Sequence, residues 1–146
     1  METEKTKSSA VAGASSLQLF AERYTAAWCS RDAASVAEFF APDGWLTING
    51  GNPSKGRGAI TEAARKFMED FPDLRVAMDR LGAEGDRFYF HWTLEGHNTG
   101  PGGSGRRVKI SGYEAWKIGE DGLIEDSQGH FDAKEYQRQI EHGFGG

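Results

Sequence analysis

The spacing of apolar residues in the first half of the chain is typical of α-helices. The first predicted helix begins at Ser15 or Ser16, where Ser15-Ser-Leu-Gln18 has the form of a capping box. Asp32 caps a second helix, and a third runs over residues 59–71. The apolar faces of the three helices contain Leu17, Phe20, Ala21, Tyr24 and Trp28, then Val36, Phe39 and Phe40, and finally Ile60, Ala63, Ala64, Phe67, Met68 and Phe71.

The second half of the chain alternates between apolar and polar residues, as β-strands do. A short strand at residues 45–48 precedes longer ones at 74–82, 88–97 and 107–118, and a last strand follows the turn at 120–122. A short amphipathic helix closes the chain. Helices followed by long antiparallel strands predict an α+β fold, in which helices cover the concave face of a curled sheet and leave a cone-shaped cavity.

Residues 15–146 are predicted to form one domain, because 146 residues suffice for one hydrophobic core. Residues 1–14 are rich in Ser, Ala and Lys and have little apolar area to bury. We expect them to form a flexible N-terminal arm.

Charge and cysteine content narrow the class of partner. The net charge is −5, and no long basic run is present, which argues against nucleic acid or an anionic membrane as the main partner. No apolar run approaches the 18 or so residues of a membrane span. The single cysteine, Cys29, excludes an internal disulfide and fits a reducing cytoplasm.

Aromatic residues are plentiful, with nine Phe, four Trp and four Tyr. Some of these rings are expected to line a ligand cavity, although most pack the core of a small domain. The candidates for the cavity lining or a dimer face are Trp28, Trp45, Trp92, Tyr113 and Trp116.

The last strand contains the densest set of candidate site residues. Alternate residues of a strand share a face, so Asp126, Gln128, His130 and Asp132 lie together. A row of acid, amide, imidazole and acid is costly to bury, and it suits a cavity wall. The opposite face then contains Glu125, Ser127, Gly129 and Phe131.

Two roles are open to Asp132. It is a candidate general acid–base with His130 as its partner, and apolar neighbours such as Trp45 and Trp116 would raise its pKa. Alternatively, Asp132-Ala-Lys-Glu135 has the form of a helix N-cap, which would favour the charged carboxylate. His130 is open to both a functional and a structural reading.

Other polar candidates lie outside the last strand. Tyr24 either directs its hydroxyl into the cavity as an oxyanion donor or is a core aromatic of the first helix. His91 and His97 share a face of the strand over 88–97 and are candidate pocket residues. The histidines lack the close spacing of metal ligands, so no metal site is predicted.

Three sequence blocks resemble the SnoaL-like polyketide cyclases, a family within the nuclear-transport-factor-2-like superfamily. The first is Trp92-Thr-Leu-Glu-Gly-His-Asn-Thr-Gly100, similar to the family's tryptophan strand that ends in Gly-Thr-His-x-Gly. The second is Gly103-Ser-Gly-Arg-Arg-Val108, followed by Gly112. The third is Asp121-Gly-Leu-Ile-Glu-Asp126, with a later Asp132 and a closing Gln139-Ile140.

The resemblance implies a cone-shaped α+β fold, a dimer formed through the outer sheet face, and an acid–base carboxylate at Asp132. The chain departs from the family where Ser127 and Gln128 replace a common His-Trp pair, and where His130 replaces an apolar residue. The ketosteroid isomerases are a partial match through Tyr24, but their catalytic aspartate would fall near Ile48.

Two functions are consistent with these residues. The first is an enzyme of the cyclase, isomerase or dehydratase type that moves a proton next to the carbonyl of a small hydrophobic ligand, without a cofactor. The second is a non-catalytic ligand-binding or dimerisation module of the same fold, and in both cases we expect a homodimer. Convergence of Asp132, His130 and Tyr24 on an open cavity would favour the enzyme.

Overall fold

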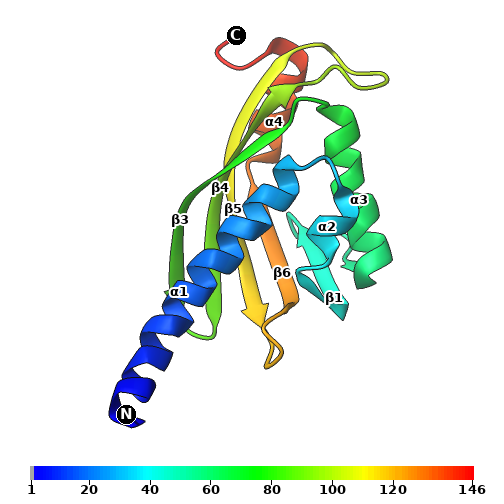
Figure 1. Ribbon diagram of the computed structural model, residues 1–146. Helices are drawn as coiled ribbons and strands as arrows, with labels where there is room; N and C mark the ends of the chain where they lie inside the picture. Colours follow the sequence, from blue (N-terminus) through cyan, green and yellow to red (C-terminus); the bar gives the residue numbers. More distant parts are fainter. Residues whose placement is uncertain (1) are drawn as a thin grey trace.

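The computed structural model describes the backbone of residues 2–146 and the side chains from Ser16 onward (Figure 1). Four helices and six strands follow one another along this part of the chain. They are α1 (Glu2–Cys29), α2 (Ala33–Ala37), β1 (Phe40–Ile48), β2 (Ser54–Lys55), α3 (Gly56–Asp70), β3 (Arg75–Glu84), β4 (Arg87–His97), β5 (Arg107–Ile118), β6 (Ile124–Phe131) and α4 (Ala133–His142).

The strands form one curved, open sheet in the order β2-β1-β6-β5-β4-β3. Strands β3 to β6 are antiparallel neighbours, as predicted, whereas β1 pairs with β6 in parallel. Helices α1 and α3 lie across the same side of the sheet, with the short α2 between them (Figure 1). The α+β fold with helices over the concave face is therefore confirmed, with the correction that the sheet is mixed.

Two predicted helix boundaries were wrong. Helix α2 ends at Ala37, and the chain is already extended from Phe40, because Phe40 pairs with Ile124 of β6 in the sheet. Helix α1 begins at Glu2 rather than at Ser15, since Glu, Lys and Ala before that point are good helix formers. The side chains of residues 1–15 lie outside the described part, and the dispensable arm stays a prediction.

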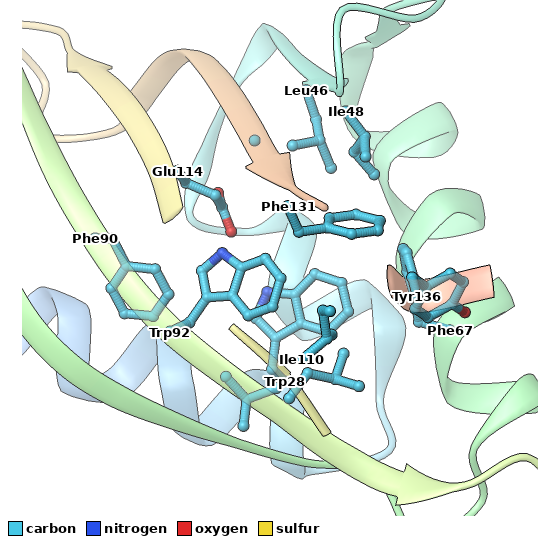
Figure 2. Close-up of a pocket in the computed structure, with 13 residues that line it drawn as sticks. Trp28, Leu46, Ile48, Phe67, Phe90, Trp92, Ile110, Glu114, Phe131 and Tyr136 are labelled. Atoms are coloured by element: carbon cyan, nitrogen blue, oxygen red, sulfur yellow. The ribbon is translucent and has the colours of Figure 1, made fainter. Parts of the chain in front are cut away.

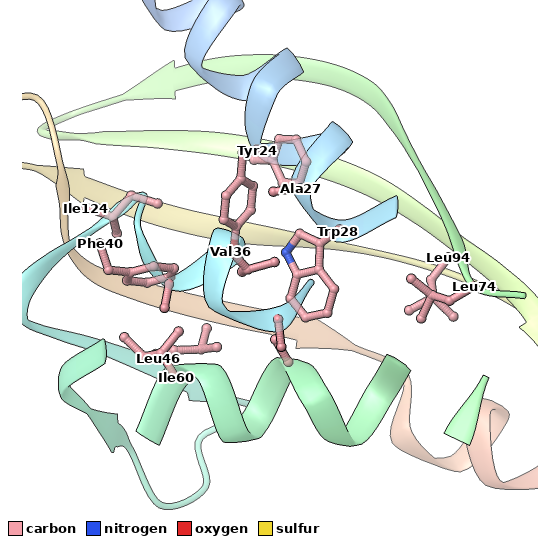
Figure 3. Packing of buried hydrophobic residues seen from close by; sticks show 14 of the residues in the cluster. Tyr24, Ala27, Trp28, Val36, Phe40, Leu46, Ile60, Leu74, Leu94 and Ile124 are labelled. Carbon is pink, nitrogen blue, oxygen red and sulfur yellow. The ribbon is translucent and has the colours of Figure 1, made fainter. Parts of the chain in front are cut away.

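Aromatic side chains fill the space between α1 and the sheet. Tyr24, Phe40, Phe90 and Trp116 are all buried (Figure 3 shows the packing around Tyr24). The ring of Tyr24 meets that of Trp116 edge to face at 5.2 Å, and Phe90 stacks on Trp116 at 5.0 Å. This aromatic packing lies next to the cavity, which Phe90 also lines.

Helix α4 begins at the predicted N-cap. The Asp132 carboxylate accepts a hydrogen bond from the backbone N–H of Glu135 at 3.0 Å. Further along the helix, the buried Gln139 accepts a hydrogen bond from the Lys109 backbone N–H at 2.7 Å and so ties α4 to β5. The capping role of Asp132 that the sequence predicted is confirmed.

Removing this cap gives a first prediction. Asp132→Ala should lower the free energy of unfolding by about 1 kcal/mol, whereas Asp132→Asn should nearly preserve it, because asparagine caps helices about as well. Urea unfolding of the two variants and the wild type measures the difference. Equal losses in both variants would contradict a role limited to the cap.

Candidate functional site

A cavity of about 60 Å³ lies between the concave face of the sheet and three of the helices (Figure 2). Trp28 of α1, Phe67 of α3 and Tyr136 of α4 form the helical side of its wall. The sheet contributes the remaining lining residues, which are Leu46, Ile48, Val76, Phe90, Trp92, Leu94, Ile110, Glu114, Gly129 and Phe131.

Strand alternation explains which sheet residues reach the cavity. On β4, Phe90, Trp92 and Leu94 are two residues apart and share the concave face. On β6, the inward positions are Gly129 and Phe131. The cavity wall is therefore apolar almost throughout, with one carboxyl group in it.

That carboxyl group belongs to Glu114, which is buried and points toward the centre of the cavity (Figure 2). Three neutral donors hold its Oε1 atom: the Tyr24 hydroxyl at 3.0 Å, the Trp116 Nε1–H at 3.0 Å and the Ser127 hydroxyl at 2.7 Å. The Oε2 atom shares only the Tyr24 hydroxyl, at 3.1 Å. One carboxyl oxygen is thus fixed in place, and the other has room for a further hydrogen bond.

Burial sets the acidity of this cluster. It raises the pKa of Glu114, and the hydrogen bonds from Trp116, Ser127 and Tyr24 offset only part of that effect. Burial, together with the nearby Glu114 charge, raises the pKa of Tyr24 well above its ordinary value. At the cavity wall, burial and the charge of Asp70 raise the pKa of Tyr136 to about 12. Both phenols therefore stay protonated at neutral pH, and Glu114 is the group that can exchange a proton.

Two glycines make room for the site. A Cβ atom on Gly112 would lie 2.6 Å from the Trp92 ring and 2.3 Å from the His130 carbonyl oxygen, so only glycine lets this ring cover β5. A Cβ atom on Gly129 would meet nothing closer than 3.5 Å and would stand 3.8 Å from the Glu114 Cγ atom. Because Gly129 has no side chain, the space beside the Glu114 carboxyl group is left free.

The predicted cavity face of the last strand was wrong. The described structure turns Ser127, Gly129 and Phe131 inward, and His130 is exposed on the opposite face. Asp132 is also exposed, at the start of α4. The inward residues are small or aromatic because Glu114 and the Trp92 ring need the space above β6.

Several other predicted pocket residues gather on the outer face of the sheet. The Tyr113 ring lies 5.8 Å from that of His91 and 5.1 Å from that of His130. Beside them, the Gln128 amide donates to Asp126 at 2.8 Å. They form an outer-face cluster of His91, Tyr113, Gln128 and His130, on the opposite side of the sheet from the cavity.

Two further predicted pocket residues lie at the surface. Trp45 is 40% exposed, and the Lys55 ammonium lies 4.3 Å from its ring centroid. His97 is exposed and pairs with Asp73, with 2.7 Å between Nδ1 and Oδ2. Neither side chain lines the cavity, although both were predicted to do so. Trp45 precedes the inward-facing Leu46 on β1 and therefore points to the other face of the sheet, whereas His97 is the last residue of β4.

The remaining predictions fall at or next to the cavity. Trp28 lines it, as predicted. Tyr24 and Trp116 are fully buried behind it and reach it only through their hydrogen bonds to Glu114. Asp132, His130 and Tyr24 therefore do not converge on one cavity.

Sequence reasoning missed Glu114 as a site residue, although a signal was present. It is the one carboxylate among the apolar positions Val108, Ile110, Gly112 and Trp116 that share a face of β5. A lone acid on the buried face of a strand either neutralises or acquires partners.

Among the described side chains, no group of three or more His, Cys, Asp or Glu residues is placed to hold a metal ion. Within residues 2–146, no helix is long and apolar enough to cross a membrane.

Comparisons with solved structures identify the same architecture elsewhere. TsrD from Streptomyces laurentii is 25% identical, with 86% of this chain and 95% of that chain covered at a TM-score of 0.73. A protein with a ketosteroid isomerase-like fold from Catenulispora acidiphila, solved in complex with trimethylamine, is 16% identical over 83% and 91% of the two chains, with a TM-score of 0.73. A SnoaL-like polyketide cyclase-type protein from Jannaschia is 19% identical over 84% and 91%, with a TM-score of 0.70.

A comparison with curated protein sequences gives no match. The SnoaL-like domain family matches residues 21–127, which is well over half of the chain and includes Tyr24, Trp92, Glu114 and Ser127. The fold, the cavity between helices and sheet, and this match agree, and the chain belongs to the SnoaL-like domain family.

Proposed function

We propose that the protein is a small-molecule enzyme of the cyclase, isomerase or dehydratase type, in which Glu114 moves a proton at a carbon next to a carbonyl group. The observation that carries the proposal is the buried Glu114 carboxyl in an apolar cavity, held by Tyr24, Trp116 and Ser127. A carboxyl group in such surroundings has its pKa moved toward neutral pH, which suits a general acid–base.

The reaction follows from the asymmetry of the carboxyl group. Its Oε2 atom takes the proton from the substrate C–H bond, and the C–H electrons move into the enolate of the carbonyl group. The same atom returns the proton to another position of the substrate. The three donors on Oε1 hold the carboxylate while it is charged, so no side chain has to reorganise. This proton transfer needs no redox cofactor.

The size of the cavity narrows the substrate. A volume of about 60 Å³ fits a compact group of a few heavy atoms, whereas pockets for drug-sized ligands usually hold several hundred Å³. We therefore propose a small hydrophobic carbonyl compound, or a small carbonyl end of a larger one, rather than a fused polycycle. Fold neighbours described as a polyketide cyclase and as an epoxide hydrolase/cyclase-like enzyme support only the general reaction type.

The second candidate is a non-catalytic module that binds a small ligand in the same cavity. Tyr24 favours it, because its ring is fully buried in the core and its hydroxyl already hydrogen bonds to both oxygens of Glu114. In this case Glu114 is a structural and ligand-binding group, and no proton transfer to the ligand occurs.

We also propose that the chain forms a homodimer through the outer face of the sheet. The helices α1, α3 and α4 line the cavity on the concave side of the sheet, and Figure 1 shows α1 and α3 on that same side. The half-buried rings of His91 and Tyr113 lie on the outer face beside the exposed His130. Burying such rings against the same rings of a second copy would stabilise an isologous pair.

Replacing a central residue of this face tests the dimer. Tyr113→Glu should convert the protein to a monomer of 16.0 kDa, because it would place two like charges near the two-fold axis. Sedimentation equilibrium at micromolar concentration measures the mass. A wild-type protein that sediments as a clean monomer would refute the proposal.

The proton-transfer role is tested by deuterium exchange. In D₂O, the protein should speed the exchange of the α-hydrogens of a small β-keto ester, followed by ¹H NMR. Glu114→Gln should lower this rate about 10²–10⁴-fold, because an amide cannot carry the proton. Asp132→Asn and His130→Gln are matched controls outside the cavity and should exchange at the wild-type rate.

The opposite pattern, with exchange lost in Asp132→Asn and kept in Glu114→Gln, would return the acid–base role to Asp132. Binding of the ketoester without exchange in any variant would select the non-catalytic module. Tryptophan fluorescence follows binding independently, because Trp28 and Trp92 line the cavity.

The raised pKa of Glu114 predicts how stability depends on pH. Below the ordinary glutamate pKa of 4.5, Glu114 is protonated in both the folded and the unfolded chain. As the pH rises from 4.5 through the raised folded-state pKa, the unfolded chain ionises more readily, so the folded wild type loses stability relative to Glu114→Gln. Urea unfolding of both proteins at pH 4 and pH 8 should show this change, and a pH-independent difference would contradict the raised pKa.

A further inference from the structure

Six aromatic side chains surround the cavity: Trp28, Phe67, Phe90, Trp92, Phe131 and Tyr136. Neighbouring rings are steeply inclined to one another, with 70° between Trp28 and Phe67, 65° between Trp92 and Phe131, and 65° between Phe131 and Tyr136. The rings therefore form walls around a central space instead of a single stack, as Figure 2 shows for the labelled side chains. The π-electron faces of such walls attract a positive charge.

Among the side chains that the structure describes, Glu114 contributes the one ionisable carboxylate that lines the cavity. Its three hydrogen-bond donors, from Tyr24, Trp116 and Ser127, are all neutral. None of the ion pairs between described residues includes Glu114. An ionised carboxylate in this place therefore lacks a counter-ion among the side chains described from Ser16 onward, and a buried charge of this kind is costly.

The hydrogen-bond partners nevertheless suit the ionised form. The Trp116 indole N–H can only donate, and three donors meet at one carboxyl oxygen. The site is thus arranged to hold an ionised carboxylate. A positive charge on the cavity side, where Oε2 is available, would complete it.

The walls also indicate the kind of cation. Apart from Glu114, the lining side chains offer no carboxylate or amide oxygen to accept hydrogen bonds. A primary ammonium has three N–H groups to satisfy and is poorly matched to such walls. A tri- or tetra-alkylated ammonium has one or none, and its methyl groups pack on aromatic rings. The volume of about 60 Å³ favours a compact head of this type.

We infer that the cavity is a binding site for a small alkylated ammonium group, with the aromatic rings as a cage and Glu114 as the counter-ion. The inference rests on the proposed use of this cavity as the ligand site, and it adds the chemical class of the ligand. It does not require that the ligand is turned over.

Choline and 3,3-dimethylbutan-1-ol test the inference, because they have the same shape and differ in a positively charged nitrogen or a neutral carbon. Titrations followed by tryptophan fluorescence and by calorimetry should show choline binding at least about tenfold more tightly. Equal affinities would overturn the inference and leave an apolar pocket. This comparison uses the wild-type protein and needs no variant to fold.

Variants then locate the charge. Glu114→Gln should weaken choline binding, leave alcohol binding unchanged, and keep only the part of the preference for choline that the aromatic rings supply. Glu125→Gln removes an exposed carboxylate of β6 and controls for the change in net charge, so choline binding should be unaffected. Gly129→Ala adds one methyl group beside Glu114 without a close contact and should weaken both ligands. Choline binding that is unchanged in Glu114→Gln would overturn the counter-ion role.

Acidification gives an independent test of the same group. Choline affinity should fall as the pH drops and Glu114 becomes protonated, while the affinity for the neutral alcohol should stay constant. Tyr24, which hydrogen bonds to Glu114, and Tyr136, which lines the cavity, have raised pKa values and remain neutral over the same range. A choline affinity that is flat between pH 4 and pH 8 would contradict the assignment.

Failure of this inference is distinguishable from failure of the proposed function. Exchange of ketoester α-hydrogens without preference for choline would keep the enzyme and discard the cation site. Preference for choline without any exchange would keep the cation site and discard proton transfer to a carbonyl compound.

Discussion

The interior of this protein depends on the hydrogen bonds around one buried carboxyl group. Glu114 joins α1 through Tyr24 and β6 through Ser127, and Trp116 of its own strand completes the cluster. A buried carboxyl group without partners would destabilise the fold by several kcal/mol, so the three donors are a structural requirement as well as a chemical resource. The same contacts link α1 to β5 and β6 beside the cavity.

The fold could be predicted from the sequence because it follows from periodicity. Helical spacing in the first half and strict alternation in the second define helices and strands, and the Asp132 cap follows from local chemistry alone. The boundary between α2 and β1 could not be placed, because it depends on pairing between β1 and β6, which lie far apart in the chain. Local preferences near Phe40 did not reveal that pairing.

The site was harder to predict than the fold, for a physical reason. Alternation assigns residues to two faces of a strand, but it does not say which face the helices cover. On β6 the polar residues Gln128 and His130 suggested a cavity wall, whereas the covered face holds Ser127 and Gly129. Small inward residues such as Ser127 and Gly129 add little to the hydrophobic pattern by which a buried face is recognised. They are needed on β6 because the larger side chains of Glu114 on β5 and Trp92 on β4 occupy the space above them.

The absent side chain at Gly129 has a consequence for how relatives of this protein can diverge. Single-base changes in a glycine codon include those to alanine and aspartate. Alanine would narrow the cavity slightly and leave the Glu114 cluster intact, since a Cβ atom at position 129 would meet no close contact. Aspartate would instead set a second carboxyl group beside Glu114. Like charges so close would share a proton, and an apolar cage with one acid would become a two-acid centre by one substitution.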